Sequence, residues 1–175
     1  MATLSMKGNP VHTTGNLPAV GSKAPNFSLT KQDLSDVTLE AYAGKRIVYN
    51  IFPSLDTGVC ATSVRKFNEL ASSLPHTVVL NVSQDLPFAQ KRFCAAEGIN
   101  NVEILSAFRS NFGKDYGATI QDSGLKGLLS RAVIVTDADH NVLYTEQVNE
   151  LSHEPNYNAA IAALKEKSHG SCCCC

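Results

Sequence analysis

Hydrophobic positions along the chain form two kinds of pattern, which take turns along the sequence. One is typical of buried strands and the other of amphipathic helices. The clearest strand pattern is GKRIVYNIF, residues 44–52, where β-branched and aromatic residues follow each other almost without interruption. A run of this kind suits a strand that is buried on both faces of a sheet. Further strands are expected at residues 76–83, 101–106, 131–137 and 141–148, and shorter extended segments at residues 24–30 and 35–42.

The helical pattern is clearest after the first of these strands. There Cys60, Val64, Phe67 and Ala71 recur at the spacing of one helix face, with polar residues between them. Further helices are expected at residues 85–97, 107–117 and 154–167, the middle one being short.

Side chains near the helix ends support these boundaries. Thr57 or Asp56 can cap the first helix and Asp85 the second, because their oxygens can accept the free N–H groups of a first turn. Pro87 is tolerated in a first turn, and Gly98 is expected to end the second helix.

The order of the elements predicts the fold class. Strand, helix, strand, helix, strand, a hairpin and a final helix indicate an α/β fold with a mixed central sheet flanked by helices. Gly-Asn and Asn-Pro pairs within residues 1–20 predict a small N-terminal β-hairpin. No repeat or linker interrupts the pattern, so one domain is expected.

Composition narrows the classes of function. The chain has 175 residues, of which 43% are hydrophobic, and a formal net charge of −1 at pH 7. Its charges are scattered and its apolar runs are too short to span a bilayer, so neither a nucleic acid nor a membrane is expected as a partner. The N-terminus lacks a basic head followed by an apolar run, which favours a cytoplasmic protein, with the periplasm as an alternative.

The six cysteines are unevenly placed. Cys60 and Cys94 lie within the patterned region, whereas Cys172–Cys175 form a run at the end. In a reducing compartment, cysteines are more often reactive or metal-bound than paired in structural disulfides. The body of the chain has no C-x-x-C pair, so neither a zinc ribbon nor a thioredoxin-type redox motif is supported. Residues 169–175 are expected to be a non-native or disordered tail.

The stretch FPSLDTGVC, residues 52–60, places Cys60 in the first turn of the first helix. Free backbone N–H groups and the positive end of the helix dipole favour an anion there, and the thiolate is the nucleophilic form of cysteine. Pro53 can shield the turn from water, and the Thr57 hydroxyl, one turn back, can reach the sulfur. From position alone, Cys60 would be interpreted as a small core residue.

The proline, threonine and cysteine of PSLDTGVC match the pattern of peroxiredoxins. Together with DLPFAQKRFCAAEG and LKGLLSRAVIVTD, this stretch resembles the bacterial thiol peroxidase subgroup, an atypical 2-Cys peroxiredoxin family. The resemblance covers nearly the whole chain. It implies a thioredoxin-like fold over residues 1–168, followed by the tail, and a reaction without metal, haem or flavin.

The resemblance also assigns roles to single residues. Cys60 matches the peroxidatic cysteine, which attacks the peroxide O–O bond. Thr57 matches the residue that hydrogen-bonds the thiolate and the peroxide, and Pro53 matches the proline that packs over the site. Arg131, in SRAV, matches the arginine that stabilises the thiolate and the polarised peroxide, as a fixed cation would. Without the motif, Arg131 would be interpreted as a surface residue at a strand start.

Cys94 matches the resolving cysteine, which condenses with the Cys60 sulfenic acid to give a disulfide within the same chain. On the second helix Leu86, Ala89, Phe93 and Ala96 share an apolar face, and Cys94 lies about 100° around from Phe93, at the edge of the core. The alternative is a half-buried, inert thiol. Because a disulfide requires Cα atoms within about 7 Å, local unwinding around one or both cysteines is expected during turnover.

The resemblance implies thioredoxin as the reductant, hydrogen peroxide and organic hydroperoxides as substrates, antioxidant defence as the role, and a homodimer as the assembly. Two other functions stay open. The protein could recycle Cys60 through another partner and leave Cys94 idle, or it could be a redox sensor or holdase on the same scaffold.

Weaker features complete the sequence-based expectations. Phe52, Phe88 and Phe108 are expected near the site, where they would suit an alkyl hydroperoxide. GLKG, residues 124–127, is expected to be a loop leading to Arg131 and lying over the site. The histidines are expected on the surface or in loops, with no carboxylate or second histidine at ligand spacing; they are His12, His76, His140, His153 and His169.

Overall fold

The computed structural model describes the backbone of residues 1–172 and the side chains of residues 1–165. In chain order its elements are β1 (Thr3–Met6), β2 (Asn9–His12), β3 (Ser28–Thr30), β4 (Asp36–Thr38), the 3-10 helix η1 (Leu39–Tyr42), β5 (Arg46–Ile51), α1 (Gly58–Ala71), β6 (Thr77–Ser83), α2 (Pro87–Glu97), β7 (Glu103–Ser106), α3 (Phe112–Asp115), β8 (Ala132–Thr136), β9 (Val142–Gln147) and α4 (Tyr157–Cys172).

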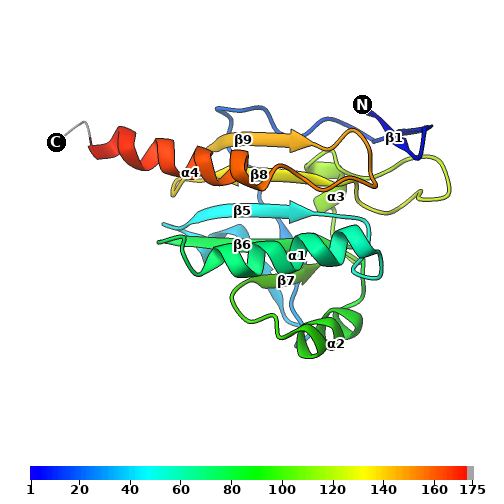
Figure 1. Cartoon of the computed structure of the whole chain (residues 1–175), viewed down its shortest axis with the longest axis horizontal. Coiled ribbons are helices and arrows are strands. Elements are labelled where there is room, and N and C mark those ends of the chain that lie inside the picture. Colours follow the sequence, from blue (N-terminus) through cyan, green and yellow to red (C-terminus); the bar gives the residue numbers. More distant parts are fainter. Residues whose placement is uncertain (173–175) are drawn as a thin grey trace.

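Seven strands form one mixed sheet in the order β4-β3-β7-β6-β5-β8-β9. Strands β5, β6 and β7 run parallel to one another, and the remaining neighbours pair antiparallel. Strands β1 and β2 form a separate antiparallel hairpin, which lies at the end of the sheet where α1 begins (Figure 1). The predicted mixed sheet, its flanking helices and the N-terminal hairpin are therefore confirmed.

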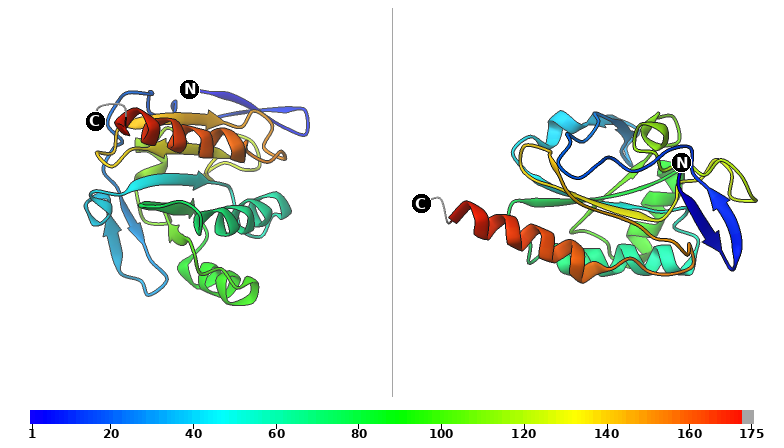
Figure 2. Two further views of the ribbon diagram at one scale, coloured as in Figure 1. Left: turned by 60° about the vertical axis from the view of Figure 1, so that its left-hand side comes forward. Right: turned by 90° about the horizontal axis from the view of Figure 1, so that it is seen from above.

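Side chains of the central strand β5 alternate between two hydrophobic layers. Ile47 and Tyr49 pack with η1, α3 and the segments around them, whereas Val48 packs with Phe67 of α1 and Leu164 of α4. Seen from above in Figure 2, α1 and α4 accordingly lie on one side of the sheet, and η1 and α3 on the other. The strand predicted to be buried on both faces is buried on both.

Two sequence-based expectations about local structure are wrong. The second half of the segment expected to be extended at residues 35–42 is the 3-10 helix η1, with Leu39 and Tyr42 turned into the core. On α2, Leu86 and Ala96 of the predicted apolar face are exposed, and Gln90 is buried instead. The Gln90 amide replaces apolar contacts with a hydrogen bond of 3.0 Å to the Leu105 carbonyl oxygen.

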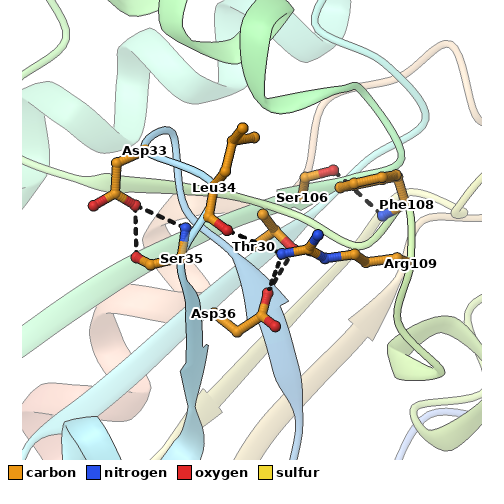
Figure 3. Close-up of polar contacts among 8 residues, drawn as sticks. All are labelled: Thr30, Asp33, Leu34, Ser35, Asp36, Ser106, Phe108 and Arg109. Atoms are coloured by element: carbon orange, nitrogen blue, oxygen red, sulfur yellow. Dashed lines mark hydrogen bonds and ion pairs between the residues drawn. The ribbon is translucent and has the colours of Figure 1, made fainter.

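The β3–β4 hairpin at the edge of the sheet is fixed by Arg109, which follows β7 (Figure 3). Its Nε donates to Thr30 Oγ1 at 3.1 Å, and its Nη2 donates to Asp36 Oδ1 at 2.9 Å and to the Leu34 carbonyl oxygen at 3.0 Å. These bonds compensate for a short antiparallel ladder between β3 and β7, in which Thr30 pairs with Ser106.

In the part of the chain that the structure describes, no helix combines the length and apolar character needed to cross a membrane. Helix α4 extends to Cys172, and the last residues of the expected tail, 173–175, lie outside the described residues.

Candidate active site

Cys60 is the third residue of α1 and is completely buried. Strand β5 and the turn after it bring the start of α1 to the C-terminal end of this central strand, so that Cys60 lies in the first turn of the helix, as predicted. The first turn is tied to the core by its own polar groups: Ser63 Oγ donates to the Cys60 carbonyl oxygen at 2.8 Å, and Asn50 Nδ2 of β5 donates to Ser63 Oγ at 3.2 Å. The thiol therefore sits at a helix N-terminus with a fixed backbone.

Arg131 meets this thiol from the other side. It directly precedes β8, is only 3% exposed, and donates from Nη2 to Cys60 Sγ at 3.2 Å. Its Nε donates to the Leu151 carbonyl oxygen at 2.9 Å, which fixes the plane of the guanidinium. Its Nη1 is buried and has no hydrogen-bond partner. The interpretation of Arg131 as a surface residue is therefore wrong, and one donor pair stays available for a ligand.

A cavity of about 330 Å³ opens beside this pair. It is lined by Pro53, Thr57, Gly58 and Val59 before and within α1, by Arg131, by Met6 and Lys7 of the hairpin, by Leu125, and by Leu151 and Ser152. Leu125 belongs to the GLKG segment, so the expectation that this loop lies over the site is confirmed. Arg131 lines this cavity, and Cys60, which does not line it, is in contact with Arg131.

Thr57 and Pro53 lie where the sequence places them, but Thr57 makes a different bond. It is the N-cap residue of α1 by its backbone, without a side-chain cap. Its hydroxyl donates to the Ser54 carbonyl oxygen at 2.9 Å, because the turn folds back on itself. The expected cap is thus absent, and the lone pairs of the hydroxyl stay available at the cavity. Pro53 is buried in the cavity wall.

Asp85 has a role that the sequence did not reveal. It was expected to cap α2, but Leu86 is the N-cap residue and Asp85 turns toward the turn before α1. Its carboxylate accepts hydrogen bonds from Ser54 Oγ at 2.7 Å, from the Leu55 N–H at 2.8 Å and from Ser83 Oγ at 2.7 Å. A capping interpretation hides this contact, because the partner lies 31 residues earlier in the chain.

Cys94 lies apart from the cavity, in the last turn of α2. It is half-buried and packs against the cluster that contains Cys60, Phe52, Val64 and Ile104. Both cysteines are free thiols. Burial raises the pKa of the Cys94 thiol, and a hydrogen bond of 3.3 Å from Gln32 Nε2 offsets part of that rise. The expected position at the edge of the core is confirmed.

Two further expectations about the site are wrong. Of the three aromatic residues expected near it, Phe52 packs with Cys60, but Phe88 is 66% exposed and Phe108 is 41% exposed, and neither lines the cavity. His12 was expected to have no carboxylate partner, yet its Nδ1 lies 2.6 Å from Asp122 Oδ2. That partner is 110 residues away in the sequence, beyond the reach of a local spacing argument.

Within the described residues, no three His, Cys, Asp or Glu side chains gather closely enough to hold a metal ion. A buried thiol at a helix N-terminus, in contact with a buried guanidinium on a mixed sheet, is the arrangement expected of a thiol-based redox protein.

Comparison with known proteins specifies this class. Residues 19–161 match the redoxin family. The chain is 57% identical over 164 residues to the thiol peroxidase of Mycobacterium tuberculosis and 55% identical over 164 residues to that of Corynebacterium glutamicum. Each alignment covers 94% of this chain and 99% of the relative. The chain therefore belongs to the redoxin family and, within it, to the thiol peroxidases.

Solved structures agree with this assignment. A peroxiredoxin-like protein from Aquifex aeolicus, 40% identical, superposes with a TM-score of 0.90 over 95% of this chain and 97% of that one. A thiol peroxidase from Chromobacterium violaceum, 24% identical, has the same fold, with a TM-score of 0.89 over 96% and 98% of the two chains. The expected thioredoxin-like fold is thereby confirmed.

Asp85 generates a prediction about stability. Asp85→Ala should lower the free energy of unfolding by about 3 kcal/mol, because three donors, two of them side-chain hydroxyls, lose a charged acceptor. Urea denaturation measures this loss. Asp56→Ala, which removes an exposed carboxylate from the same turn, is the matched control and should change the value by no more than about 0.5 kcal/mol. Equal effects of the two substitutions would contradict the role given to Asp85.

Proposed function

We propose that this thiol peroxidase reduces hydrogen peroxide and organic hydroperoxides with Cys60 as the peroxidatic cysteine, Cys94 as the resolving cysteine and thioredoxin as the reductant. The observation that carries the proposal is the contact of Arg131 Nη2 with Cys60 Sγ at 3.2 Å, in a residue that lines the cavity and whose buried Nη1 has no hydrogen-bond partner. One guanidinium can thus stabilise both the attacking sulfur and the oxygens that it attacks.

The first chemical step is a displacement at oxygen. The Cys60 thiolate attacks one peroxide oxygen, an S–O bond forms, and the O–O bond breaks. Cys60 becomes a sulfenic acid, and the second oxygen leaves with the electron pair and takes up a proton, giving water or an alcohol. The free Nη1 N–H groups of Arg131 meet the negative charge that develops on the leaving oxygen.

Thr57 and Pro53 support this step at the cavity wall. The Thr57 hydroxyl donates to the Ser54 carbonyl oxygen, so its lone pairs can accept the O–H of a bound hydroperoxide. Pro53 has no N–H and is buried, so it shields the reacting oxygens without competing for their hydrogen bonds. Both residues therefore orient the peroxide between the sulfur and the guanidinium.

The second step joins the two sulfurs. The Cys94 sulfur attacks the Cys60 sulfenic acid, a disulfide forms, and water leaves. Helix α2 is suited to unwinding at this point: only Pro87 and Gln90 are buried on it, and the Cys94 carbonyl oxygen accepts the bond of the Gly98 N–H that closes the helix. The unwinding begins at the last turn of α2.

Thioredoxin then supplies two electrons and two protons by thiol–disulfide exchange, which restores both thiols. The two sulfurs carry the electrons, so the cycle proceeds without a metal or an organic cofactor. The proposal includes the cytoplasmic location expected in the sequence analysis and a homodimeric assembly, which is carried over from the resemblance to the thiol peroxidases.

Turnover tests the two-cysteine cycle. Peroxide-dependent NADPH oxidation, coupled through thioredoxin and its reductase, should be lost in Cys60→Ser and in Cys94→Ser. Replacing Cys172–Cys175 by serine in every variant leaves Cys60 and Cys94 as the only thiols. Full turnover of Cys94→Ser would show that another thiol resolves Cys60. Oxidation of Cys60 without turnover of the wild type would favour the redox sensor.

Arg131 should control the first step. Arg131→Met keeps a stem of similar length but removes the cation, and should slow oxidation of Cys60 by about 100-fold. Rapid-quench mass spectrometry in a Cys94→Ser background measures this step alone. Arg109→Met is the matched control. Arg109 binds the β3–β4 hairpin and does not line the cavity. A similar rate in both variants would contradict the role of Arg131.

The raised pKa of Cys94 gives the second step a pH dependence. Because a thiol with a raised pKa ionises at higher pH, disulfide formation should keep accelerating past pH 9, the ordinary value for cysteine. Gln32→Ala removes the hydrogen bond that lowers this pKa and should move the profile to still higher pH. The measurement is rapid-quench mass spectrometry of the disulfide after one equivalent of peroxide. A rate of disulfide formation that levels off below pH 9 would contradict this pH dependence.

A further inference from the structure

One wall of the cavity is built by two segments that are far apart in the sequence. Met6 ends strand β1 and Lys7 begins the turn of the N-terminal hairpin, and Leu151 and Ser152 come from the loop after β9. In Figure 1 the strand β1 lies beside this loop at the end of the sheet. Neither segment contains a residue that the reaction itself uses.

Glu150 joins the two segments. Backbone bonds from the Ser5 N–H to the Asn149 carbonyl oxygen, 2.7 Å, and from the Leu151 N–H to the Ser5 carbonyl oxygen, 2.9 Å, hold the strand β1 beside the loop. They end at Ser5, before the turn. The turn itself is held by Glu150 Oε1, which accepts the Lys7 N–H at 2.8 Å.

The same carboxylate oxygen also accepts a hydrogen bond from Ser152 Oγ at 2.8 Å, so one atom bridges the turn and the loop. The Lys7 N–H and the Ser152 and Ser5 hydroxyls lower the pKa of Glu150 to about 2. The acceptor is therefore ionised at neutral pH. Lys7 has a φ of 50°, a left-handed conformation that a non-glycine residue keeps only when neighbouring contacts fix it.

The chemistry of the wall points to its ligand. Met6, Leu125, Leu151 and Val59 line the cavity and contribute apolar residues to its wall. Hydrogen peroxide is too small to need such a wall, because it can be held by Arg131 and Thr57 alone. A hydroperoxide with a bulky organic group would place that group against these side chains when its O–O bond reaches Cys60.

We propose that Glu150 is a positioning residue that fixes the hairpin turn as the wall for the organic part of a hydroperoxide, and so sets the selectivity between organic hydroperoxides and hydrogen peroxide. The proposal rests on the proposed peroxidase function. It adds a residue that touches neither the sulfurs nor Arg131.

The test compares two substrates in a Cys94→Ser background, with the rate constant of Cys60 oxidation measured by rapid-quench mass spectrometry. In Glu150→Ala the rate constant for cumene hydroperoxide should fall by about 10-fold, while that for hydrogen peroxide changes by less than about twofold. Glu150→Gln keeps an acceptor oxygen for the Lys7 N–H and should recover most of the selectivity. Met6→Ala, which shortens the wall directly, should show the same selective loss.

Asp36→Ala is the matched control, because Asp36 also anchors a hairpin through its carboxylate (Figure 3) and does not line the cavity. It should leave the ratio of the two rate constants unchanged. An unchanged ratio in Glu150→Ala and Met6→Ala, whether both rate constants fall or neither does, would overturn the proposal. A wild type whose Cys60 reacts with neither peroxide would overturn the proposed function itself, and the two failures are thereby distinguished.

Discussion

The structure depends on a cation placed in its interior beside a sulfur. Removing a guanidinium from water is costly unless its donors are paired, and none of the hydrogen bonds of Arg131 in the described part of the chain goes to a carboxylate. Its partners are one carbonyl oxygen and the sulfur of Cys60. In the proposed reaction, the Cys60 sulfur and the oxygens of the peroxide are the groups that this cation stabilises.

The need to hold this buried guanidinium brings distant parts of the chain together at one end of the central strands. The guanidinium is fixed by the Leu151 carbonyl oxygen, and the Arg131 backbone carbonyl accepts the Val148 N–H at 3.0 Å and Gln147 Nε2 at 2.9 Å. The end of β9 and the loop after it thus hold the cation from two directions. The N-terminal hairpin packs on the same loop, so the wall of the cavity and the position of the cation share one support.

The sequence was sufficient where a residue acts through its neighbours in the chain, and insufficient where it acts through a distant partner. The strand pattern of residues 44–52 and the first turn with Cys60 follow from local periodicity, and Gly98 ends α2 with a φ of 66°, as a glycine can. The contacts of Asp85 and Glu150 were not predicted, because an acidic residue near a helix start or in a loop has many local interpretations. Arg131 was found through a motif, because a strand start alone does not indicate a buried cation.

The two helices that carry the cysteines differ in how they are anchored, and this difference fits the roles proposed for the two thiols. The first turn of α1 is tied through Ser63 to Asn50, which is itself bonded to Asn81 at 2.8 Å across the two central strands. Helix α2 is held by the Gln90 amide near its start, and its last turn, which carries Cys94, packs only partly against the core. In the proposed cycle, the nucleophile that must meet a fixed guanidinium is carried by the rigid helix, and the thiol that must travel to it is carried by the helix that can unwind.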